Sequence, residues 1–290
     1  MEFISDVSGV TLGEYLKKYH GFSRRIISRL KFENGILVNG NPEFTNFMLR
    51  ENDVITVIFS EKKSENTIPQ QIPLEILYED SHLLAVNKPP SMPIHPSHGH
   101  SFGTLANAVS GYYAENGISS AVRIYGRLDK DTSGVVLISK NPLAAKLLFE
   151  TDVEKYYLAI VCGTVRENGE INAPILDLER GMRRVVSADG KHAVTQYEPI
   201  NSADGYTLLK LKLLTGRTHQ IRVHTSYMGF PILGDTLYGG EPNMPHQALH
   251  AYKLKFIHPI LKTPMEITAP IPNDMREFLC QHIGNEDFEC

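Results

Sequence analysis

The sequence contains no tryptophan, only three cysteines among 290 residues, and no long apolar run. The cysteines show no CxxC spacing, and their odd number argues against a disulfide framework. Without about 18 consecutive apolar residues, no transmembrane helix is expected. The start, MEFISDVSGV, lacks the basic-then-apolar pattern of a secretion signal. We therefore predict a cytoplasmic protein with no membrane partner.

An excess of positive charge is also missing. The chain has 29 Lys and Arg against 33 Asp and Glu, a formal net charge of −4. A protein of this charge that binds a polyanion must concentrate its basic residues locally. No dinucleotide or phosphate-loop fingerprint is present, so no cofactor is predicted. The hydrophobic content of 42% suffices for a substantial core in one large or two unequal domains.

The first 60 residues have the pattern of a small module. Helices are predicted over 12–20, capped by Thr11, and from residue 24, capped by Ser23, with strands on either side of an Asn39-Gly40 turn. Basic side chains crowd into the helical pair, which by charge alone is typical of a solvated face. These side chains are Lys17, Lys18, Arg24, Arg25, Arg29 and Lys31.

Residues 61–73 are polar and interrupted by proline, which indicates a linker between a domain at 1–60 and a domain at 74–290. Strand-like runs recur beyond the linker in an irregular order, and several alternate polar with apolar residues. This pattern favours the α+β class with a mixed, largely antiparallel sheet over a doubly wound parallel sheet.

The stretch GRLDKDTSG, residues 126–134, sets Asp129 directly before a strand-like apolar run. Taken alone, its polar residues are those of an ordinary turn. However, a carboxylate at the edge of a buried strand is partly desolvated, which costs free energy unless a cation pairs with it. The sequence therefore predicts a cationic partner for Asp129.

The strongest candidate for that cation is Arg222. Thr218 can cap a helix over 219–228, which places Arg222 near the positive pole of the helix dipole, where a cation needs an anionic partner. A dense polar run surrounds it and suits a polar ligand. This run is Arg217, His219, Gln220, Arg222 and His224. Tyr157, at the start of another strand, is a packed core aromatic, a stacking platform or a proton carrier.

Together these stretches resemble the RluA-type RNA pseudouridine synthases. GRLDKDTSG is similar to their central motif, KYYLAIVCGTV (155–165) to their second and TGRTHQIRVH (215–224) to their third. The segment YEDSHLLAVNKPPSMPIHPS (78–97) resembles the one that precedes the central motif. FSRRIISRL and GILVNG, in the first 60 residues, are similar to an S4 RNA-binding domain. The matches cover nearly the whole chain in the family's order.

The resemblance implies the pseudouridine-synthase fold and an isomerase that converts uridine in RNA to pseudouridine without cofactor or metal. It makes Asp129 the essential carboxylate, Arg222 its partner, and Tyr157 the residue that packs on the uracil. Arg127 then fills the space left by the extruded base. One departure is Gly126, where the family commonly has histidine.

RNA is the partner that the resemblance implies, with ribosomal RNA favoured over transfer RNA and a monomer expected. Near the catalytic group, Arg217, His219 and Gln220 are candidate substrate-binding residues. In the S4-like unit the candidates are Arg24, Arg25 and Lys31, which would hold phosphates. The acidic net charge is then compatible with RNA, because the basic residues are concentrated.

Three alternatives remain open. A catalytically silent RNA-binding protein would share the fold. A metal hydrolase could use His95, His98 and His100, although their spacing is irregular. A glycosidase would need a pair of carboxylates, for which Asp129 and Asp131 sit in one turn.

Overall fold

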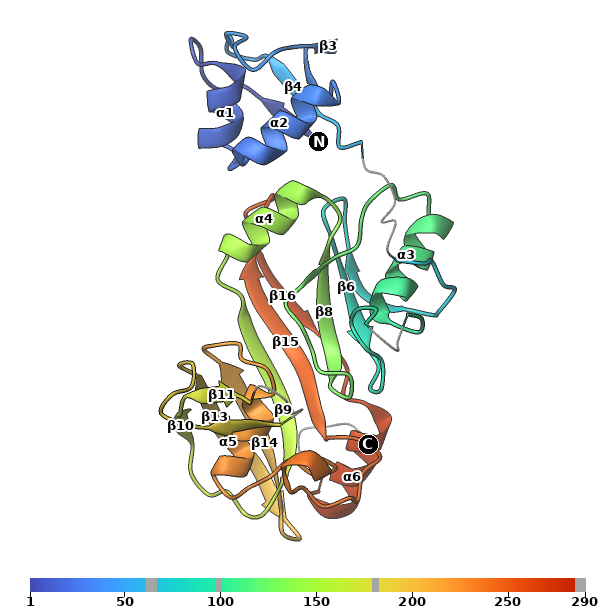
Figure 1. The fold of residues 1–290 in the computed structure, drawn as a ribbon, viewed down its shortest axis with the longest axis vertical. Coiled ribbons are helices and arrows are strands. Elements are labelled where there is room, and N and C mark those ends of the chain that lie inside the picture. Colours follow the sequence, from blue (N-terminus) through green and yellow to red (C-terminus); the bar gives the residue numbers. More distant parts are fainter. Residues whose placement is uncertain (61–66, 98–100, 179–182, 285–290) are drawn as a thin grey trace.

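The computed structural model describes residues 1–60, 67–97, 101–178 and 183–284. An N-terminal domain lies at one end of the elongated molecule (Figure 1). Its elements are β1 (Glu2–Ile4), α1 (Leu12–Lys18), α2 (Arg24–Phe32), β2 (Ile36–Val38), β3 (Asn41–Pro42) and β4 (Val54–Val57). The strands form an antiparallel sheet in the order β1-β4-β2-β3. Both predicted helices are present.

The predicted caps of these two helices are confirmed. The Thr11 hydroxyl accepts the Glu14 N–H at 3.3 Å, and the Ser23 hydroxyl accepts the Ile26 N–H at 3.2 Å. The N-terminal core also includes Leu143 from the larger domain, which is only 1% exposed. The two domains are therefore in apolar contact at this point.

The larger domain is built on one long sheet. Among the described residues, its strands run in the order β10-β13-β14-β9-β15-β8-β6-β5, with β16 paired to β15 and β7 to β8. These strands are β5 (Glu75–Glu79), β6 (Leu83–Lys88), β7 (Arg123–Tyr125), β8 (Ser133–Ser139), β9 (Glu154–Cys162), β10 (Gly169–Asn172), β13 (Val194–Ala203), β14 (Tyr206–Leu213), β15 (Leu249–Ile257) and β16 (Pro264–Thr268). A separate small ribbon pairs β11 (Ile175–Asp177) with β12 (Arg184–Val186).

The long sheet has two halves that meet where β15 lies parallel to β8. This contact consists of two residue pairs, His250 with Ser133 and Ala251 with Gly134, and every other pairing in the sheet is antiparallel. The predicted α+β class with a mixed, largely antiparallel sheet is confirmed. Gly134 permits the close approach, because a Cβ there would lie 2.2 Å from the Ala251 carbonyl oxygen.

Helices cover the sheet at several places (Figure 1). They are α3 (Leu105–Glu115), α4 (Pro142–Glu150), α5 (Gln220–Tyr227), the 3-10 turn η1 (Thr236–Tyr238) and α6 (Asn273–His282). The predicted linker falls partly outside the described residues, at 61–66. Its described remainder runs along α3, where the Gln70 N–H donates to the Asn107 carbonyl at 3.1 Å. No helix in the described ranges is both long and apolar enough to span a bilayer.

A buried histidine lies at the junction of the two halves of the long sheet. His250 is fully buried, with Nδ1 2.9 Å from the Ser133 hydroxyl. Burial lowers the pKa of His250 to about 4, below an unfolded value of about 6.5. The folded state therefore binds fewer protons, so stability is complete above the unfolded pKa and falls as the pH drops toward 4.

We expect the free energy of unfolding to fall by about 1 kcal/mol when the pH is lowered from 7.5 to 5.5, because His250 takes up a proton only in the unfolded state. Urea unfolding at the two pH values measures this loss. His250→Asn should show a loss smaller by that amount, because asparagine does not titrate. His192→Asn, at an exposed position, should keep the full loss. Equal acid sensitivity in wild type and His250→Asn would contradict the assignment.

Candidate functional site

The loop between β7 and β8 carries Asp129 to the junction of the two half-sheets. The Thr132 N–H donates to the Asp129 carbonyl at 3.2 Å, which closes a turn, and the Gln247 amide donates to the Thr132 hydroxyl at 2.7 Å. The loop is thus tied to the segment that leads into β15. The Asp129 side chain remains 17% exposed, so a ligand can reach it.

A buried lysine also holds this loop in place. Lys88, at the end of β6, has no exposed surface. Its ammonium donates to the carbonyls of Pro89 at 2.8 Å, Met92 at 3.0 Å and Lys130 at 2.8 Å. Burial lowers the pKa of Lys88, while the charges of Asp131 and Asp129 oppose that shift. Since all three protons of an ammonium are used, we take Lys88 to act as the cation.

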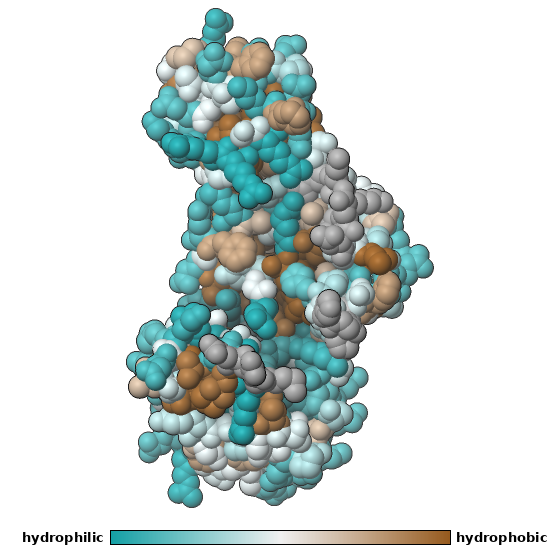
Figure 2. Space-filling model, viewed as in Figure 1, coloured by the Kyte–Doolittle hydropathy of each residue, from teal (hydrophilic) through white to brown (hydrophobic). Residues whose placement is uncertain are grey.

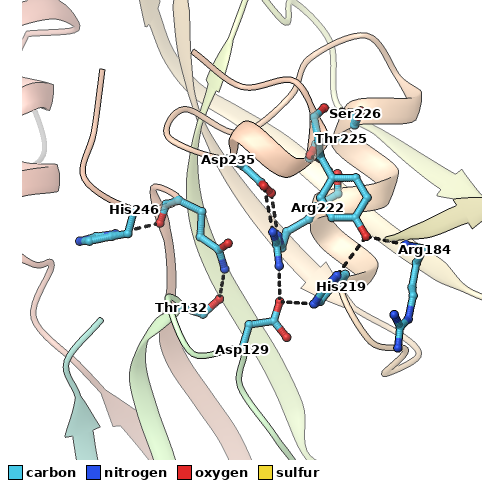
Figure 3. A network of polar contacts seen from close by, with 11 residues as sticks. Asp129, Thr132, Arg184, His219, Arg222, Thr225, Ser226, Asp235 and His246 are labelled. Carbon is cyan, nitrogen blue, oxygen red and sulfur yellow. Dashed lines mark hydrogen bonds and ion pairs between the residues drawn. The ribbon is translucent and has the colours of Figure 1, made fainter. Parts of the chain in front are cut away.

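Arg222 lies between two carboxylates, as Figure 3 shows. Its Nε and Nη2 donate to Asp235 at 2.6 and 2.9 Å, and its Nη1 donates to Asp129 at 3.2 Å. Burial alone would lower the pKa of Arg222, but the Asp235 hydrogen bonds and both carboxylate charges raise it. The guanidinium is therefore locked by Asp235 and presents its remaining edge to Asp129.

The helix that carries Arg222 begins differently from the prediction. His219, not Thr218, is the N-cap of α5, and His219 is in the left-handed region with φ 58° and makes no side-chain cap bond. The preceding loop is satisfied instead by Gln220, whose amide oxygen accepts the Arg217 N–H and the Thr215 hydroxyl, both at 2.9 Å. The predicted Thr218 cap is therefore wrong, and the hydrogen bonds of this loop are made by the Gln220 side chain, which turns back toward it.

The His219 ring faces Asp129 on one side and Tyr238 on the other. Its Nε2 lies 3.7 Å from Asp129 Oδ2, and its Nδ1 lies 3.0 Å from the Tyr238 hydroxyl. Burial lowers the pKa of His219, and the nearby Arg222 lowers it further, although Asp129 opposes them. The ring is therefore neutral near pH 7, which leaves Arg222 as the charged neighbour of Asp129 at this end of the site.

A cavity of about 160 Å³ opens beside Asp129 and is lined by Tyr157, Arg222 and Lys155 among others. A cavity of roughly 150 Å³ is large enough to hold benzene. Tyr157 is 7% exposed, and burial raises the pKa of its hydroxyl, with the Asp129 charge adding to the effect. One planar ring fits this space, against a neutral phenol and beside a paired carboxylate.

A wider groove of about 1060 Å³ surrounds the mouth of the cavity. The exposed Arg127 contributes to both, and the exposed Arg217 lies at the cavity rim with its Nε donating to the His192 carbonyl at 3.0 Å. In the space-filling view, hydrophobic residues gather in patches over the middle and lower parts of the larger domain, amid a mostly hydrophilic surface (Figure 2). The two exposed arginines make the edge of the cavity suitable for a polar ligand.

The structure therefore brings one set of predicted site residues together. These are Asp129, Tyr157, Arg222, Arg127, Arg217, His219 and Gln220, all at the cavity. Gln220 is 2% exposed, and its amide bonds Val194 and Thr195 as well as the loop, so it positions the wall. Arg24, Arg25 and Lys31 are exposed on α2 of the N-terminal domain, away from this cavity.

Three residues were missed by the sequence reasoning: Lys88, Asp235 and Tyr238. Asp235 bonds Arg222, Tyr238 lies 3.0 Å from the His219 ring, and Lys88 bonds the loop that carries Asp129. These partners lie far apart in the sequence, so no periodic pattern reveals them. Asp235 and Tyr238 lie in GFPILGDTLYG (229–239), which follows the third motif in the chain. The one available signal was that Asp235 is an acid 13 residues after Arg222.

The residues behind two alternatives can be located in part. Asp131 lines the wider groove and not the cavity, and it accepts the Ser91 hydroxyl at 3.3 Å. His95 lines the same groove, while His98 and His100 lie outside the described residues. Within the described ranges no cluster of three metal-binding side chains occurs.

Comparison with known proteins supports one family. The family model described as RNA pseudouridylate synthase matches residues 82–227. The RNA pseudouridine synthase YjbO of Bacillus subtilis is 39% identical over 93% of this chain and 98% of its own length. Ribosomal large subunit pseudouridine synthase D of Vibrio cholerae is 36% identical over 96% of this chain and 94% of its own.

A solved structure agrees with these sequence matches. Human RNA pseudouridylate synthase domain containing 1 has a TM-score of 0.58 and 27% identity, covering 68% of this chain and 83% of that one. At this TM-score and identity the two chains share their fold.

Proposed function

Since this chain belongs to the RNA pseudouridylate synthase family, we propose that it converts uridine in ribosomal RNA to pseudouridine with Asp129 as the essential carboxylate. Membership makes the chain an isomerase that acts on RNA. The observation that carries the proposal is the Asp129 carboxylate, held 3.2 Å from Arg222 Nη1 beside a cavity of about 160 Å³. That cavity suits a single pyrimidine ring.

The reaction breaks the bond between ribose C1′ and uracil N1, turns the base and joins C5 to C1′. Neither reacting atom is accessible in a stacked helix, so the target nucleotide must leave the stack and enter the cavity. Asp129 then lies beside the sugar, either as a nucleophile or as a base at C2′. Arg222, fixed by Asp235, stabilises its charge through the reaction.

Tyr157 is proposed to pack on the uracil and to take part in the C5 proton step. Its raised hydroxyl pKa keeps the phenol neutral, so the ring can contact the base without a charge beside Asp129. Arg127, exposed at the mouth of the cavity, is proposed to fill the gap that the extruded base leaves. Arg217 and His219 line the approach and suit the ribose and its phosphates.

Ribosomal RNA is the proposed substrate because relatives named ribosomal large subunit pseudouridine synthase D match almost end to end. The N-terminal domain is proposed to be S4-like and to bind this RNA, and the protein to work as a cytoplasmic monomer. Arg24 and Arg25 open α2, and its first turn contains no acidic residue. Two cations at the positive pole of a helix favour a phosphate.

Replacing Arg24 and Arg25 together by alanine should weaken RNA binding and reduce the slope of log K against log salt by about 1 to 2, with turnover of bound RNA retained. Filter binding over a range of salt concentrations measures the slope. Arg29→Ala is a matched control, since its guanidinium already bonds Glu33 at 2.9 Å and the Ser60 carbonyl at 3.0 Å. An unchanged slope in the double variant would remove α2 from the RNA interface.

Pseudouridine mapping of total RNA tests the function directly. Cells lacking the gene should lose a site in large-subunit ribosomal RNA, and a wild-type copy should restore it. A site lost in transfer RNA instead would correct the substrate. If no site changes in cells that also lack any sister enzyme, the silent RNA-binding alternative becomes the better explanation.

A further inference from the structure

Besides its arginines, the cavity is lined by one lysine, Lys155. Lys155 is the second residue of β9 and lines the same cavity as Tyr157. The two side chains share one face of the strand, because successive residues alternate. They are therefore about 7 Å apart along β9, at a rise of about 3.3 Å per residue. Besides burial, the Asp129 charge raises the pKa of Tyr157, whereas the acid that acts on the pKa of Lys155 is Asp152. We therefore place Lys155 toward the end of the cavity away from Asp129.

Among the described residues, Lys155 has neither an ion-pair nor a hydrogen-bond partner. Its Nζ lies 5.2 Å from the centroid of the Tyr125 ring. Lys212, which faces out from the neighbouring strand β14, is bonded to Glu154 at 2.5 Å. Burial lowers the pKa of Lys155, with Asp152 only partly opposing the shift. A half-buried, unpaired ammonium is costly, so this site favours a ligand that accepts a hydrogen bond.

The chemistry of uracil supplies such an acceptor at the right end of the ring. When N1 is attached to C1′, the ring atom opposite the attachment is C4, which carries O4. After the base turns and C5 is attached, the opposite atom is C2, which carries O2. A donor at the far end of the cavity therefore meets a carbonyl oxygen before and after the isomerisation. In cytosine the same position carries an amino group, which donates and would oppose an ammonium.

We propose that Lys155 recognises the base: its ammonium donates to uracil O4 in the substrate and to O2 in the product. This inference rests on the proposed function and adds to it a residue that selects uracil over cytosine. As the base turns, O2 takes the place of O4 as the hydrogen-bond acceptor. Lys155 can therefore bond the same end of the ring in the substrate and in the product. The cation–π contact with Tyr125 keeps the lysine in the cavity when no base is bound.

The test pairs a change in the protein with a change in the RNA. The probe is a stem-loop of the mapped ribosomal site, made with uridine or with 2-pyrimidinone ribonucleoside, which lacks O4, at the target position. Dissociation constants are measured in the inactive Asp129→Asn background with Lys155 retained or changed by Lys155→Met. With Lys155 retained, loss of O4 should weaken binding about 10- to 100-fold. Lys155→Met should weaken binding to the uridine RNA similarly and bind both RNAs alike.

Two further variants separate recognition from structure. Lys155→Arg keeps a donor and should retain part of the preference for uridine, which a purely structural role would not predict. A thermal melt of Lys155→Met shows whether the fold persists, and loss of a buried charge should not lower its Tm. If the two RNAs differ equally with and without Lys155, the inference is overturned. A fall in the salt slope in place of a change in base preference would assign Lys155 to a phosphate.

The same stem-loop distinguishes this inference from the function on which it rests. Wild-type enzyme, with Asp129 intact, is incubated with the uridine stem-loop and pseudouridine is quantified. Absence of product overturns the proposed function and the inference together. Normal product formation with no coupling between Lys155 and O4 overturns the inference alone.

Discussion

Asp129→Asn should abolish pseudouridine formation, lowering turnover at least about 10⁴-fold. The amide is almost the same size as the carboxylate but can neither attack C1′ nor take a proton. Binding and folding should change little, because Arg222 keeps its two bonds to Asp235. Single-turnover assays with saturating enzyme measure the chemical step separately from binding.

Asp131→Asn is the matched control for this experiment. Asp131 lies two residues further along the same loop but lines the wider groove and not the cavity. We expect its turnover to stay within a few-fold of wild type. More than a trace of activity in a correctly folded Asp129→Asn protein would remove Asp129 from its proposed role. Equal losses in both variants would point to damage of the loop.

Asp235→Ala should lower both stability and turnover. Its side chain is 1% exposed and holds Arg222 through two hydrogen bonds, so alanine leaves a buried guanidinium with one partner. Breaking a buried pair from one side costs about 3 kcal/mol of unfolding free energy. Turnover should fall about 10- to 100-fold, since the cation beside Asp129 is no longer fixed. Urea unfolding and single-turnover rates measure the two effects.

The double variant Arg222→Met with Asp235→Leu separates these effects. Removing both charges and filling the space should recover most of the lost stability. Turnover should not recover, because Asp129 then has no cation. A double variant as active as wild type would show that the pair serves only the fold.

The contact between Asp129 and Arg222 spans 93 residues of sequence, yet its two members could be found before the structure. Each is out of place in its own segment: an acid against an apolar strand, and a cation at the positive end of a helix. Such mismatches are readable because they concern one element at a time. The sheet class was also predictable, since alternation within strands reports which faces are buried.

Other features depend on how distant segments meet, which no local pattern encodes. Lys88 reads as the ordinary end of a strand until the Lys130 carbonyl is found 2.8 Å from its ammonium. The left-handed turn at His219 arises because Gln220 bonds back to the preceding loop, and this competes with a Thr218 cap that is equally plausible from sequence. The two-residue parallel contact between β15 and β8 is likewise too short to leave a signature.

Lys88 determines when the entropy of ordering the loop that carries Asp129 is lost. Its ammonium fixes three carbonyls near the proposed catalytic carboxylate, and no part of it reaches solvent. The entropy of ordering that loop is therefore lost once, when the chain folds, and not again with each RNA molecule. In each encounter the nucleotide has to move and the Asp129 carboxylate stays in place. An unfolded target loop in the RNA should then speed the reaction more than any added flexibility in the protein.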